Sequence, residues 1–201
     1  MLLFNYSNII DPVLKEVRTC VAGLPGIKTG DRVLDVCCGT GDQVFHYEQM
    51  GAVATGVDQN PNMIEVAERN RKRRGFKHST FRIAGATELP FPDDYFDCAS
   101  LSLGLHEMER EERNRAISEM KRVVKKEGVL LFIDFRVPMP NNLIAFVIRA
   151  VEFIAGRENY KRFKDYLTQG GLKGILKENQ LIPQEEALAL SGNIQILKVQ
   201  S

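Results

Sequence analysis

The stretch Val33 to Asp42 reads VLDVCCGTGD, and 17 residues after Gly41 the chain carries an acidic residue, Asp58, in Gly56-Val57-Asp58. An apolar run that meets an acid, breaks into Gly39-Thr40-Gly41 and then turns amphipathic is typical of a strand, a tight loop and a helix N-terminus. Glycines let the backbone approach a ligand closely, and a second strand that ends in an acid can accept both hydroxyls of a ribose. This spacing predicts a nucleotide-binding layout.

Length and charge favour one domain that acts on a small molecule. At 201 residues the chain can form one full hydrophobic core and does not require two. Lysine plus arginine number 27 against 26 for aspartate plus glutamate, so there is no general electrostatic footprint for nucleic acid or anionic lipid. The basic run from Arg69 to Arg74 precedes Gly75, where cations favour the end of a helix; contact with a polyanion is the alternative.

The cysteines indicate a reducing environment. Cys20, Cys37, Cys38 and Cys98 show neither metal-ligand spacing nor a disulfide framework, so we expect small buried thiols and no metal site. A cytoplasmic location follows as an expectation.

No membrane-spanning or signal segment is predicted. The N-terminal apolar residues are soon interrupted by polar ones, which disfavours a signal peptide. The longest apolar segment, Leu143 to Ala155, contains Arg149 and Glu152 and is shorter than the ~20 residues that span a bilayer.

Strands and helices alternate through residue 135. The β-rich and apolar runs predict strands at 32–36, 52–57, 80–83, 96–103 and 129–135. Helices are expected from Asp11-Pro12 towards Gly23, at 42–50, from Asn60-Pro61 to the basic run, and at 109–126 with Gly128 ending the last. This order predicts a parallel sheet with right-handed crossovers, which binds ligands at the carboxyl ends of its strands.

The pattern changes after residue 135. Helices are predicted near 142–155 and 160–179, followed by two alternating runs, 185–191 and 194–199. The Gly192-Asn193 pair between these runs is a hairpin signal. A sheet closed by an antiparallel hairpin, together with the absent third glycine of G-x-G-x-x-G, disfavours a nicotinamide-dependent dehydrogenase.

Four segments together make the chain resemble the class I S-adenosylmethionine-dependent methyltransferases. They are GDRVLDVCCGTGD at 30–42, GVDQNPNMIEVAE at 56–68, ELPFPDDYFD at 88–97 and EMKRVVKKEGVLLFIDF at 119–135. Within the class the chain is most similar to the ubiquinone and menaquinone biosynthesis C-methyltransferases and their small-molecule relatives. The resemblance implies an α/β fold with a doubly wound, mostly parallel seven-stranded sheet, Rossmann-like and closed by the C-terminal hairpin.

The resemblance also implies a domain plan and an activity. Residues 1–201 would form one methyltransferase domain, with an N-terminal helical lid at 1–29, a cofactor-binding core at 30–135, and substrate-side helices and the hairpin at 136–201. The reaction would transfer a methyl group from S-adenosylmethionine to a small apolar acceptor such as a quinone precursor, leaving S-adenosylhomocysteine.

The family's cofactor contacts carry over to matching positions of this chain. Asp35 would help hold the methionine amino group, Asp58 would accept the ribose hydroxyls, and Leu101 and Ser102 would lie beside the sulfonium. Gln59 and Met63 would border the adenine. The full predicted set is Tyr6, Asp35, Cys37, Gly39, Thr40, Gly41, Asp58, Gln59, Met63, Gly85, Ala86, Thr87, Leu101 and Ser102.

One departure from the family pattern concerns the adenine. Relatives often read Gly-Asp-Ala-Glu where this chain reads Ala84-Gly85-Ala86-Thr87, so the aspartate that would accept the adenine amino group is absent. Adenine recognition would then rest on the Ala86 N–H and Thr87. Losing one such hydrogen bond weakens binding by ~1–3 kcal/mol without abolishing it.

Structural explanations compete with several of these roles. Gly39 and Gly41 could serve only a tight turn, Asp58 could cap the following helix, and Met63 could belong to the core.

Acceptor-side residues are predicted from their positions at strand ends. His106 follows the fourth strand and is the best candidate for a general base, although backbone or Glu107 could satisfy it instead. Asp134 could orient the acceptor or bind the following loop. Tyr6 and Tyr160 are candidate pocket aromatics or core residues.

The apolar segment 143–154 suggests packing, a homodimer contact, peripheral contact with a membrane or cover for an apolar acceptor. A non-catalytic cofactor-binding or scaffold protein is the alternative function. RNA methylation is disfavoured by the near-neutral charge.

Overall fold

The computed structural model describes residues 26–201 together with Val17 and Val21. Both of these valines are buried. The rest of the predicted N-terminal helix and Tyr6 lie outside the described residues.

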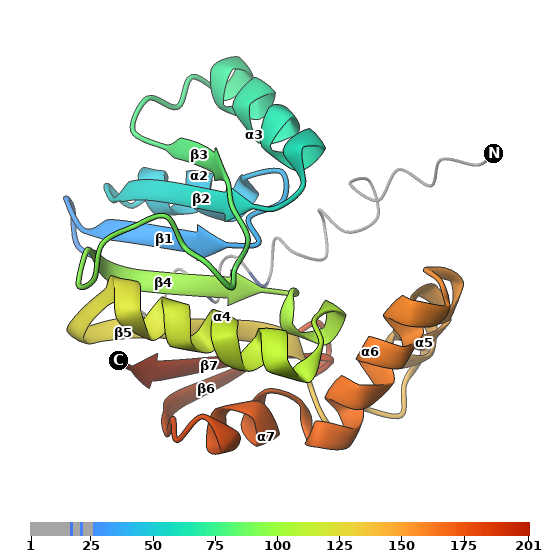
Figure 1. Ribbon diagram of the computed structural model, residues 1–201. Coiled ribbons are helices and arrows are strands. Elements are labelled where there is room, and N and C mark those ends of the chain that lie inside the picture. The colour runs from blue at the N-terminus through green and yellow to red at the C-terminus, as the bar shows by residue number, and fades with distance from the viewer. Residues whose placement is uncertain (1–16, 18–20, 22–25) are drawn as a thin grey trace.

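Seven strands form one sheet in the order β3-β2-β1-β4-β5-β7-β6 (Figure 1). The first five strands run parallel, whereas β7 is antiparallel to both β5 and β6. This confirms the predicted sheet and its terminal hairpin. The strands are β1 (Arg32–Val36), β2 (Val53–Asp58), β3 (Thr80–Ile83), β4 (Phe96–Ser102), β5 (Val124–Phe135), β6 (Pro183–Ala189) and β7 (Ile194–Gln200).

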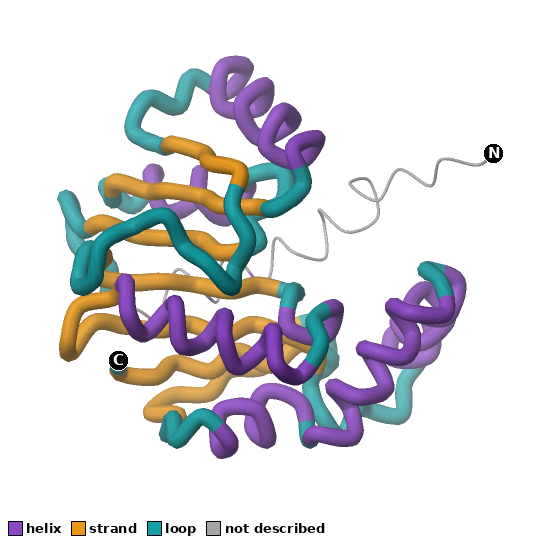
Figure 2. Tube along the Cα trace, in the orientation of Figure 1, coloured by secondary structure: helices purple, strands orange, loops and turns teal. Residues whose placement is uncertain are grey.

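Helices cover both faces of the sheet. Figure 1 shows α4 in front of the strands and α2 behind them, whereas α5 and α6 lie off the edge where the parallel strands end. Figure 2 shows the same arrangement, with the helices in purple and the strands in orange. The helices are α2 (Asp42–Gln49), α3 (Pro61–Arg74), the 3-10 turn η1 (Leu105–Glu107), α4 (Arg110–Val123), α5 (Leu143–Ile154), α6 (Arg157–Gln169) and α7 (Gly171–Glu178).

The central strands are buried on both faces, as their continuous apolar runs predict. Val33, Leu34 and Val36 of β1 are 0% exposed, and so are Ala99 and Leu101 of β4. Strand order reverses between β1 and β4, because β2 and β3 lie on one side of β1 and β4 on the other. A ligand of an open α/β sheet binds outside the carboxyl ends of the strands at such a point.

Helix α4 ends earlier than predicted, and β5 begins directly after it at Val124. The expectation that Gly128 ends the helix was wrong. Val124 pairs with Phe96 and the next registered pair is Cys98 with Val129, so the intervening residues bulge. A Cβ at Gly128 would lie 2.9 Å from the Asp97 carbonyl oxygen, so glycine is required there because the bulge approaches β4 closely.

The predicted helix at 160–179 is two helices. Gly170 has a φ of 92° and Gly171 a φ of 62°, both left-handed, so the chain turns between α6 and α7. A Cβ at Gly171 would lie 2.6 Å from Val137 Cγ2, so the turn also packs closely on another loop. The apolar residues keep a helical spacing on both sides of the two glycines, so the sequence pattern predicted one continuous helix.

Two other predicted turns are confirmed. Gly75 caps α3 in a left-handed conformation after the basic last turn, and Arg74 Nη1 lies 2.6 Å from Asp42 Oδ1 on α2. Gly192 and Asn193 lie in the connection between β6 and β7. The basic run thus lies in the last turn of α3, which fits its predicted role at a helix end.

Candidate active site

The loop after β1 places its backbone at the switch point of the sheet. Gly39 has a φ of 52° and Gly41 a φ of 86°, which side-chain-bearing residues rarely adopt. A Cβ built on Gly39 would meet no atom within 4 Å, so its surface opens away from the protein. Cys37, at the end of the strand, also has a positive φ, of 60°. The loop thus presents open backbone at the site predicted for the methionine and ribose.

Gly41 is constrained by packing as well. It starts α2, and a Cβ on it would lie 2.6 Å from Phe81 Cζ and 3.2 Å from Ala67 Cβ. These neighbours belong to β3 and α3. Gly41 therefore lies where α2 begins and packs closely against β3 and α3.

Replacing Gly41 by alanine should lower stability more than the same change at Gly39. Left-handed strain contributes ~1–2 kcal/mol and overpacking a further ~1–3 kcal/mol, whereas Gly39→Ala suffers only the strain. Urea unfolding of the two variants measures the difference. Equal losses would contradict the packing role assigned to Gly41.

Asp58 is held in place by two backbone donors. Its Oδ2 accepts the Gly39 N–H at 3.0 Å, and its Oδ1 accepts the Asn60 N–H at 2.8 Å. The N-cap of α3 is Asn60, whose side chain accepts the Asn62 N–H at 3.0 Å, so the capping alternative belongs to Asn60. Each oxygen of an ionised carboxylate accepts more than one hydrogen bond, so Asp58 keeps acceptor capacity for a diol.

A buried polar contact joins β1 to β4 beneath this loop. Asp35 is 2% exposed, and its Oδ1 accepts the Ser100 hydroxyl at 2.6 Å. Leu101 is fully buried on β4, whereas Ser102 is half-buried at the strand's end. Thr40 is half-buried in the loop itself.

The predicted adenine side lies at the ends of β2 and β3. Gln59 is exposed, Met63 is half-buried, and Ala86 is buried within the 84–87 loop, where Gly85 and Thr87 are half-buried. Ile83, which ends β3 beside Asp58, is 62% exposed. Sequence reasoning missed Ile83, because an isoleucine at a strand end is indistinguishable from a core residue.

His106 and Asp134 form a buried pair at the ends of β4 and β5. His106 Nδ1 lies 2.7 Å from Asp134 Oδ1, and the two residues are 3% and 0% exposed. Asp134 also accepts the backbone N–H groups of His106, at 3.1 Å, and of Phe135, at 2.7 Å. An ionised carboxylate only accepts, so Nδ1 carries the hydrogen and Nε2 is the nitrogen open to chemistry.

The surroundings raise the proton affinity of His106. Burial alone would lower its pKa, but Asp134, through its charge and its hydrogen bond, together with Glu152 and Glu107, raises the pKa above 6.5. The Phe135 ring lies 4.6 Å from the imidazole, centroid to centroid, and shields it from solvent.

This raised pKa predicts a pH-dependent contribution to folding. The folded chain holds the His106 proton more tightly than the unfolded chain, so the stabilisation is complete below pH 6.5 and is lost as pH rises through the raised pKa. Urea unfolding of the wild type and His106→Gln from pH 6 to 9 measures it. The stability difference should shrink with increasing pH; a difference that grows would contradict the assignment.

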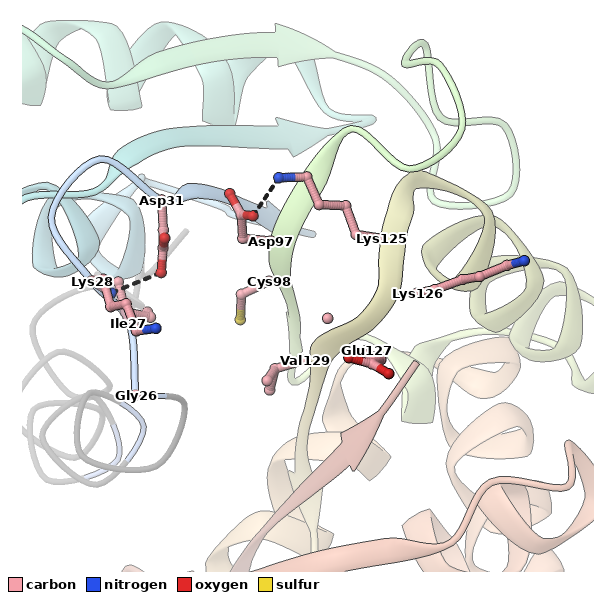
Figure 3. Close-up of a pocket in the computed structure, with 11 residues that line it drawn as sticks. Gly26, Ile27, Lys28, Asp31, Asp97, Cys98, Lys125, Lys126, Glu127 and Val129 are labelled. Carbon is pink, nitrogen blue, oxygen red and sulfur yellow. Dashed lines mark hydrogen bonds and ion pairs between the residues drawn. The ribbon is translucent and has the colours of Figure 1, made fainter.

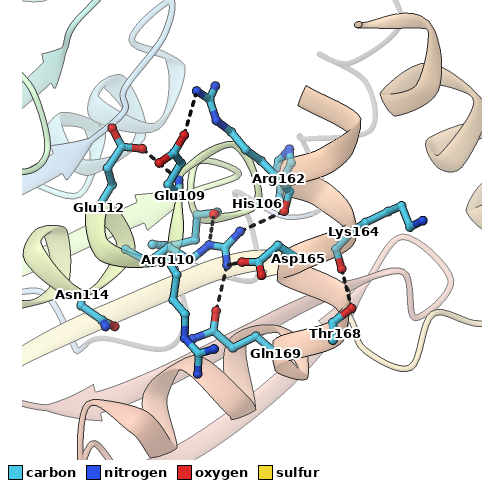
Figure 4. A network of polar contacts seen from close by, with 12 residues as sticks. His106, Glu109, Arg110, Glu112, Asn114, Arg162, Lys164, Asp165, Thr168 and Gln169 are labelled. Atoms are coloured by element: carbon cyan, nitrogen blue, oxygen red, sulfur yellow. Dashed lines mark hydrogen bonds and ion pairs between the residues drawn. The ribbon is translucent and has the colours of Figure 1, made fainter. Parts of the chain in front are cut away.

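A buried arginine fixes the turn that carries His106. Arg113 of α4 is 0% exposed, and its Nε donates to the Leu105 carbonyl at 2.8 Å. Its Nη1 donates both to Asp165 Oδ2 at 2.6 Å and to Gln169 Oε1 at 2.8 Å, and these two residues lie on α6 (Figure 4). Sequence reasoning missed this residue, because an arginine in a charged helix predicts a solvated side chain.

Cys37 lies between the glycine loop and the histidine pair. Burial, followed by the charges of Asp58, Asp35, Glu107 and Asp134, raises the pKa of its thiol far above the ordinary value. A Cβ on Gly104, just before η1, would lie 2.9 Å from the Cys37 sulfur. The loops after β1 and β4 therefore touch, and the thiol between them is unsuited to nucleophilic chemistry.

Tyr160 lies apart from this pair in the α5–α6 layer. Its ring meets Phe153 of α5 edge-on, with centroids 5.3 Å apart. The structure thus places Tyr160 in helix packing, and its role toward an acceptor stays a prediction.

A pocket lies at the amino ends of the strands, opposite the glycine loop (Figure 3). Asp97 Oδ1 lies 2.5 Å from Lys125 Nζ there, and Asp31 accepts the Lys28 backbone N–H at 2.7 Å. Paired charges at the amino ends of the strands fit a structural role.

Comparison with known proteins agrees with this geometry. Residues 34–132 match the family model described as a methyltransferase domain. A demethylmenaquinone methyltransferase of Alkalihalophilus pseudofirmus is 32% identical over 146 residues, covering 70% of this chain and 61% of that protein. Residues 34–132 thus carry a methyltransferase domain, and the chain resembles the class I S-adenosylmethionine-dependent methyltransferases.

The chain is also similar to the ubiquinone/menaquinone biosynthesis C-methyltransferase UbiE of Pectobacterium carotovorum. They share 34% identity over 122 residues, which cover 59% of this chain and 48% of the relative. The chain thus spans about half to three-fifths of the curated relatives it matches. In fold it is similar to a S-adenosylmethionine-dependent methyltransferase of Aquifex aeolicus, with a TM-score of 0.71, 19% identity, and coverage of 98% of this chain and 96% of that one.

The residues present fit the cofactor of this family. Gly39 leaves open space where a side chain would project, and Asp58 is pre-oriented by two N–H donors beside it. Gly39 would lie against the methionine portion, and Asp58 would hold the ribose hydroxyls. No carboxylate lies in the 84–87 loop, so the adenine would depend on backbone groups and Thr87.

Proposed function

We propose that this methyltransferase transfers the methyl group of S-adenosylmethionine to a small apolar acceptor of the quinone-precursor type. The observation that carries the proposal is the buried Asp134–His106 pair, which lies at the carboxyl ends of β4 and β5 next to the cofactor loop. A base at that position is suited to an acceptor with an acidic hydroxyl. The names of the curated relatives support a quinone-like acceptor.

When bound, S-adenosylmethionine supplies a methyl group that is already activated by its sulfonium. The protein's task is then to hold the acceptor in line with the methyl–sulfur bond, and well-oriented reactants can gain on the order of 7 kcal/mol or more. Asp134 keeps the His106 ring in one orientation through Nδ1. Nε2 would remove a hydroxyl proton and so raise the electron density of the acceptor ring.

This chemistry favours the reduced, hydroquinone form of such an acceptor. A methyl cation equivalent bonds to an electron-rich carbon or oxygen, and a deprotonated hydroquinone provides both. An oxidised quinone provides neither and carries no proton for His106 to remove.

Transfer of a labelled methyl group tests the proposal. Purified protein with methyl-labelled S-adenosylmethionine is assayed against reduced quinone precursors, phenols and lipid amines, after a thermal-shift screen with S-adenosylhomocysteine present. We expect label in a hydroquinone or phenol. Cofactor binding without transfer to any member of the panel would favour the non-catalytic alternative.

We also propose that the outer face of α5 contacts an anionic membrane, from which an apolar acceptor would be drawn. The large apolar side chains of that helix are exposed: Leu143 76%, Phe146 67%, Val147 49%, Val151 46%, Phe153 66% and Ile154 81%. The exposed charged residues of α5 and α6 are four cations, Arg149, Arg157, Lys161 and Lys164, and two acids, Glu158 and Asp165. Exposed apolar residues beside cations suit an anionic bilayer surface.

Replacing Phe146 and Ile154 together by serine should weaken vesicle binding at least tenfold, because each buried side chain contributes roughly 1.5–3 kcal/mol. Sedimentation with phosphatidylglycerol and phosphatidylcholine vesicles measures it, and binding should require the anionic lipid. Ile182→Ser is the control, since Ile182 is 82% exposed but lies outside α5. A wild-type protein that does not sediment with vesicles, or that dimerises through α5, would refute membrane contact.

A further inference from the structure

Helix α5 carries two charged residues on different sides. Arg149 is exposed, whereas Glu152 is 9% exposed and shares the packed side of the helix with Ala145. Phe146 and Ile154 face outward instead. A carboxylate on the packed side of an otherwise apolar helix loses its hydration, which is unfavourable unless a partner compensates for it.

That partner is His106. Glu152 Oε1 lies 3.7 Å from His106 Nε2, the nitrogen that Asp134 leaves open. Within the described part of the chain, no other basic side chain lies at ion-pair distance from Glu152. The imidazole thus lies between one carboxylate from β5 and another from α5.

The other groups around the imidazole are few. Glu107, on η1 itself, has its Oε1 4.0 Å from Nε2, but its side chain is 59% exposed. The elements packed against the ring contribute Phe135 from β5, and Phe163 and Tyr166 from α6, all aromatic. Glu152 is therefore the buried carboxylate near Nε2.

We propose that Glu152 is a positioning residue for the methyl transfer, which holds the Nε2 edge of His106 and receives the proton that His106 takes from the acceptor. The proposal rests on the function proposed above. Burial raises the pKa of Glu152, with Glu107 and Asp134 also raising it and His106 opposing them, so the pKa values of both partners are shifted towards the protonated form.

The acceptor O–H bond breaks, its electron pair stays on the acceptor, and the proton bonds to Nε2. The acceptor forms its new bond to the methyl carbon as the carbon–sulfur bond breaks, with that pair remaining on sulfur. The proton then passes from Nε2 to Glu152 Oε1, and the side chain is 12% exposed, which gives it an outlet to water.

Histidine titration by NMR tests the contact without any acceptor. The chain has three histidines, so the His106 signal can be assigned with His106→Gln and followed against pH in the wild type, Glu152→Gln and Glu107→Gln. We expect the His106 midpoint to fall in Glu152→Gln, because a buried negative charge is removed from beside Nε2. Glu107→Gln should shift it less, since that side chain is solvated. An unchanged midpoint in Glu152→Gln, or an equal shift in both variants, would overturn the proposal.

Activity provides the second measurement, with demethylmenaquinol as the probe. Glu152→Gln should lower kcat about 10- to 100-fold and move the acid limb of its pH profile, with the Kd for S-adenosylhomocysteine unchanged. Glu152→Asp should restore part of the rate. A wild type without cofactor binding would refute the proposed function, whereas an active wild type matched by Glu152→Gln would refute only the role of Glu152.

Discussion

Replacing Asp58 by alanine is expected to weaken S-adenosylhomocysteine binding by at least about 100-fold. The carboxylate would accept two ribose hydroxyls, and hydrogen bonds to a charged group contribute ~1.5–3 kcal/mol each, with tenfold in affinity for every 1.4 kcal/mol. The substitution also removes the acceptor that holds the Gly39 N–H at 3.0 Å, so the glycine loop loses its anchor. Isothermal calorimetry measures the change directly.

A matched carboxylate provides the control for this loss. Asp97 lies at the amino end of β4, where it pairs with Lys125 and accepts the Arg32 N–H at 2.8 Å. Asp97→Asn should therefore leave cofactor affinity unchanged. Asp58→Asn should bind with intermediate affinity, because an amide oxygen accepts but carries no charge. Full affinity in Asp58→Ala would show that the ribose does not lie at the end of β2.

Replacing His106 by glutamine is expected to lower kcat for methyl transfer to demethylmenaquinol by about 10²- to 10⁴-fold. Glutamine keeps a polar side chain beside Asp134 but cannot take a proton. Cofactor affinity should remain near the wild-type value, since His106 is not among the residues proposed to hold the cofactor. Rates measured at saturating cofactor separate the chemical step from binding.

A second active-site variant and a control variant accompany His106→Gln. Asp134→Asn should also lower kcat, because Nδ1 loses the carboxylate 2.7 Å away that fixes its hydrogen. His78→Gln, at an exposed position ahead of β3, should be as active as the wild type. A His106→Gln enzyme with full activity would remove the histidine from the reaction and leave positioning as the whole of the catalysis.

The sequence predicted the core well because its signals there are local. β1 and β3 have the predicted bounds, since a short run rich in β-forming residues between turn residues is typical of a strand. His106 and Asp134 were each expected at a strand end, and the parallel pairing of β4 with β5 brings them to 2.7 Å across 28 residues. The two residues could be predicted separately, but their contact depends on the pairing of β4 with β5.

The remaining features depend on contacts that no local pattern encodes. Glu152 interrupts an apolar helix, and periodicity could not assign it to the packed side because apolar residues nearly surround that helix. Arg113 is buried by α6, an element about 50 residues further along. Strand β5 begins at Val124 because Phe96 pairs with it, which overrides a helical pattern that continues past that point.

The glycine loop and Asp58 together form the centre of this account, since they determine which cofactor the sheet can hold. Calorimetric titration of the wild-type chain with S-adenosylmethionine and, separately, with NAD tests that assignment most directly. Saturable binding of one S-adenosylmethionine per chain and no heat with NAD is the predicted result. Binding of NAD, with no heat from S-adenosylmethionine at high concentration, would contradict it.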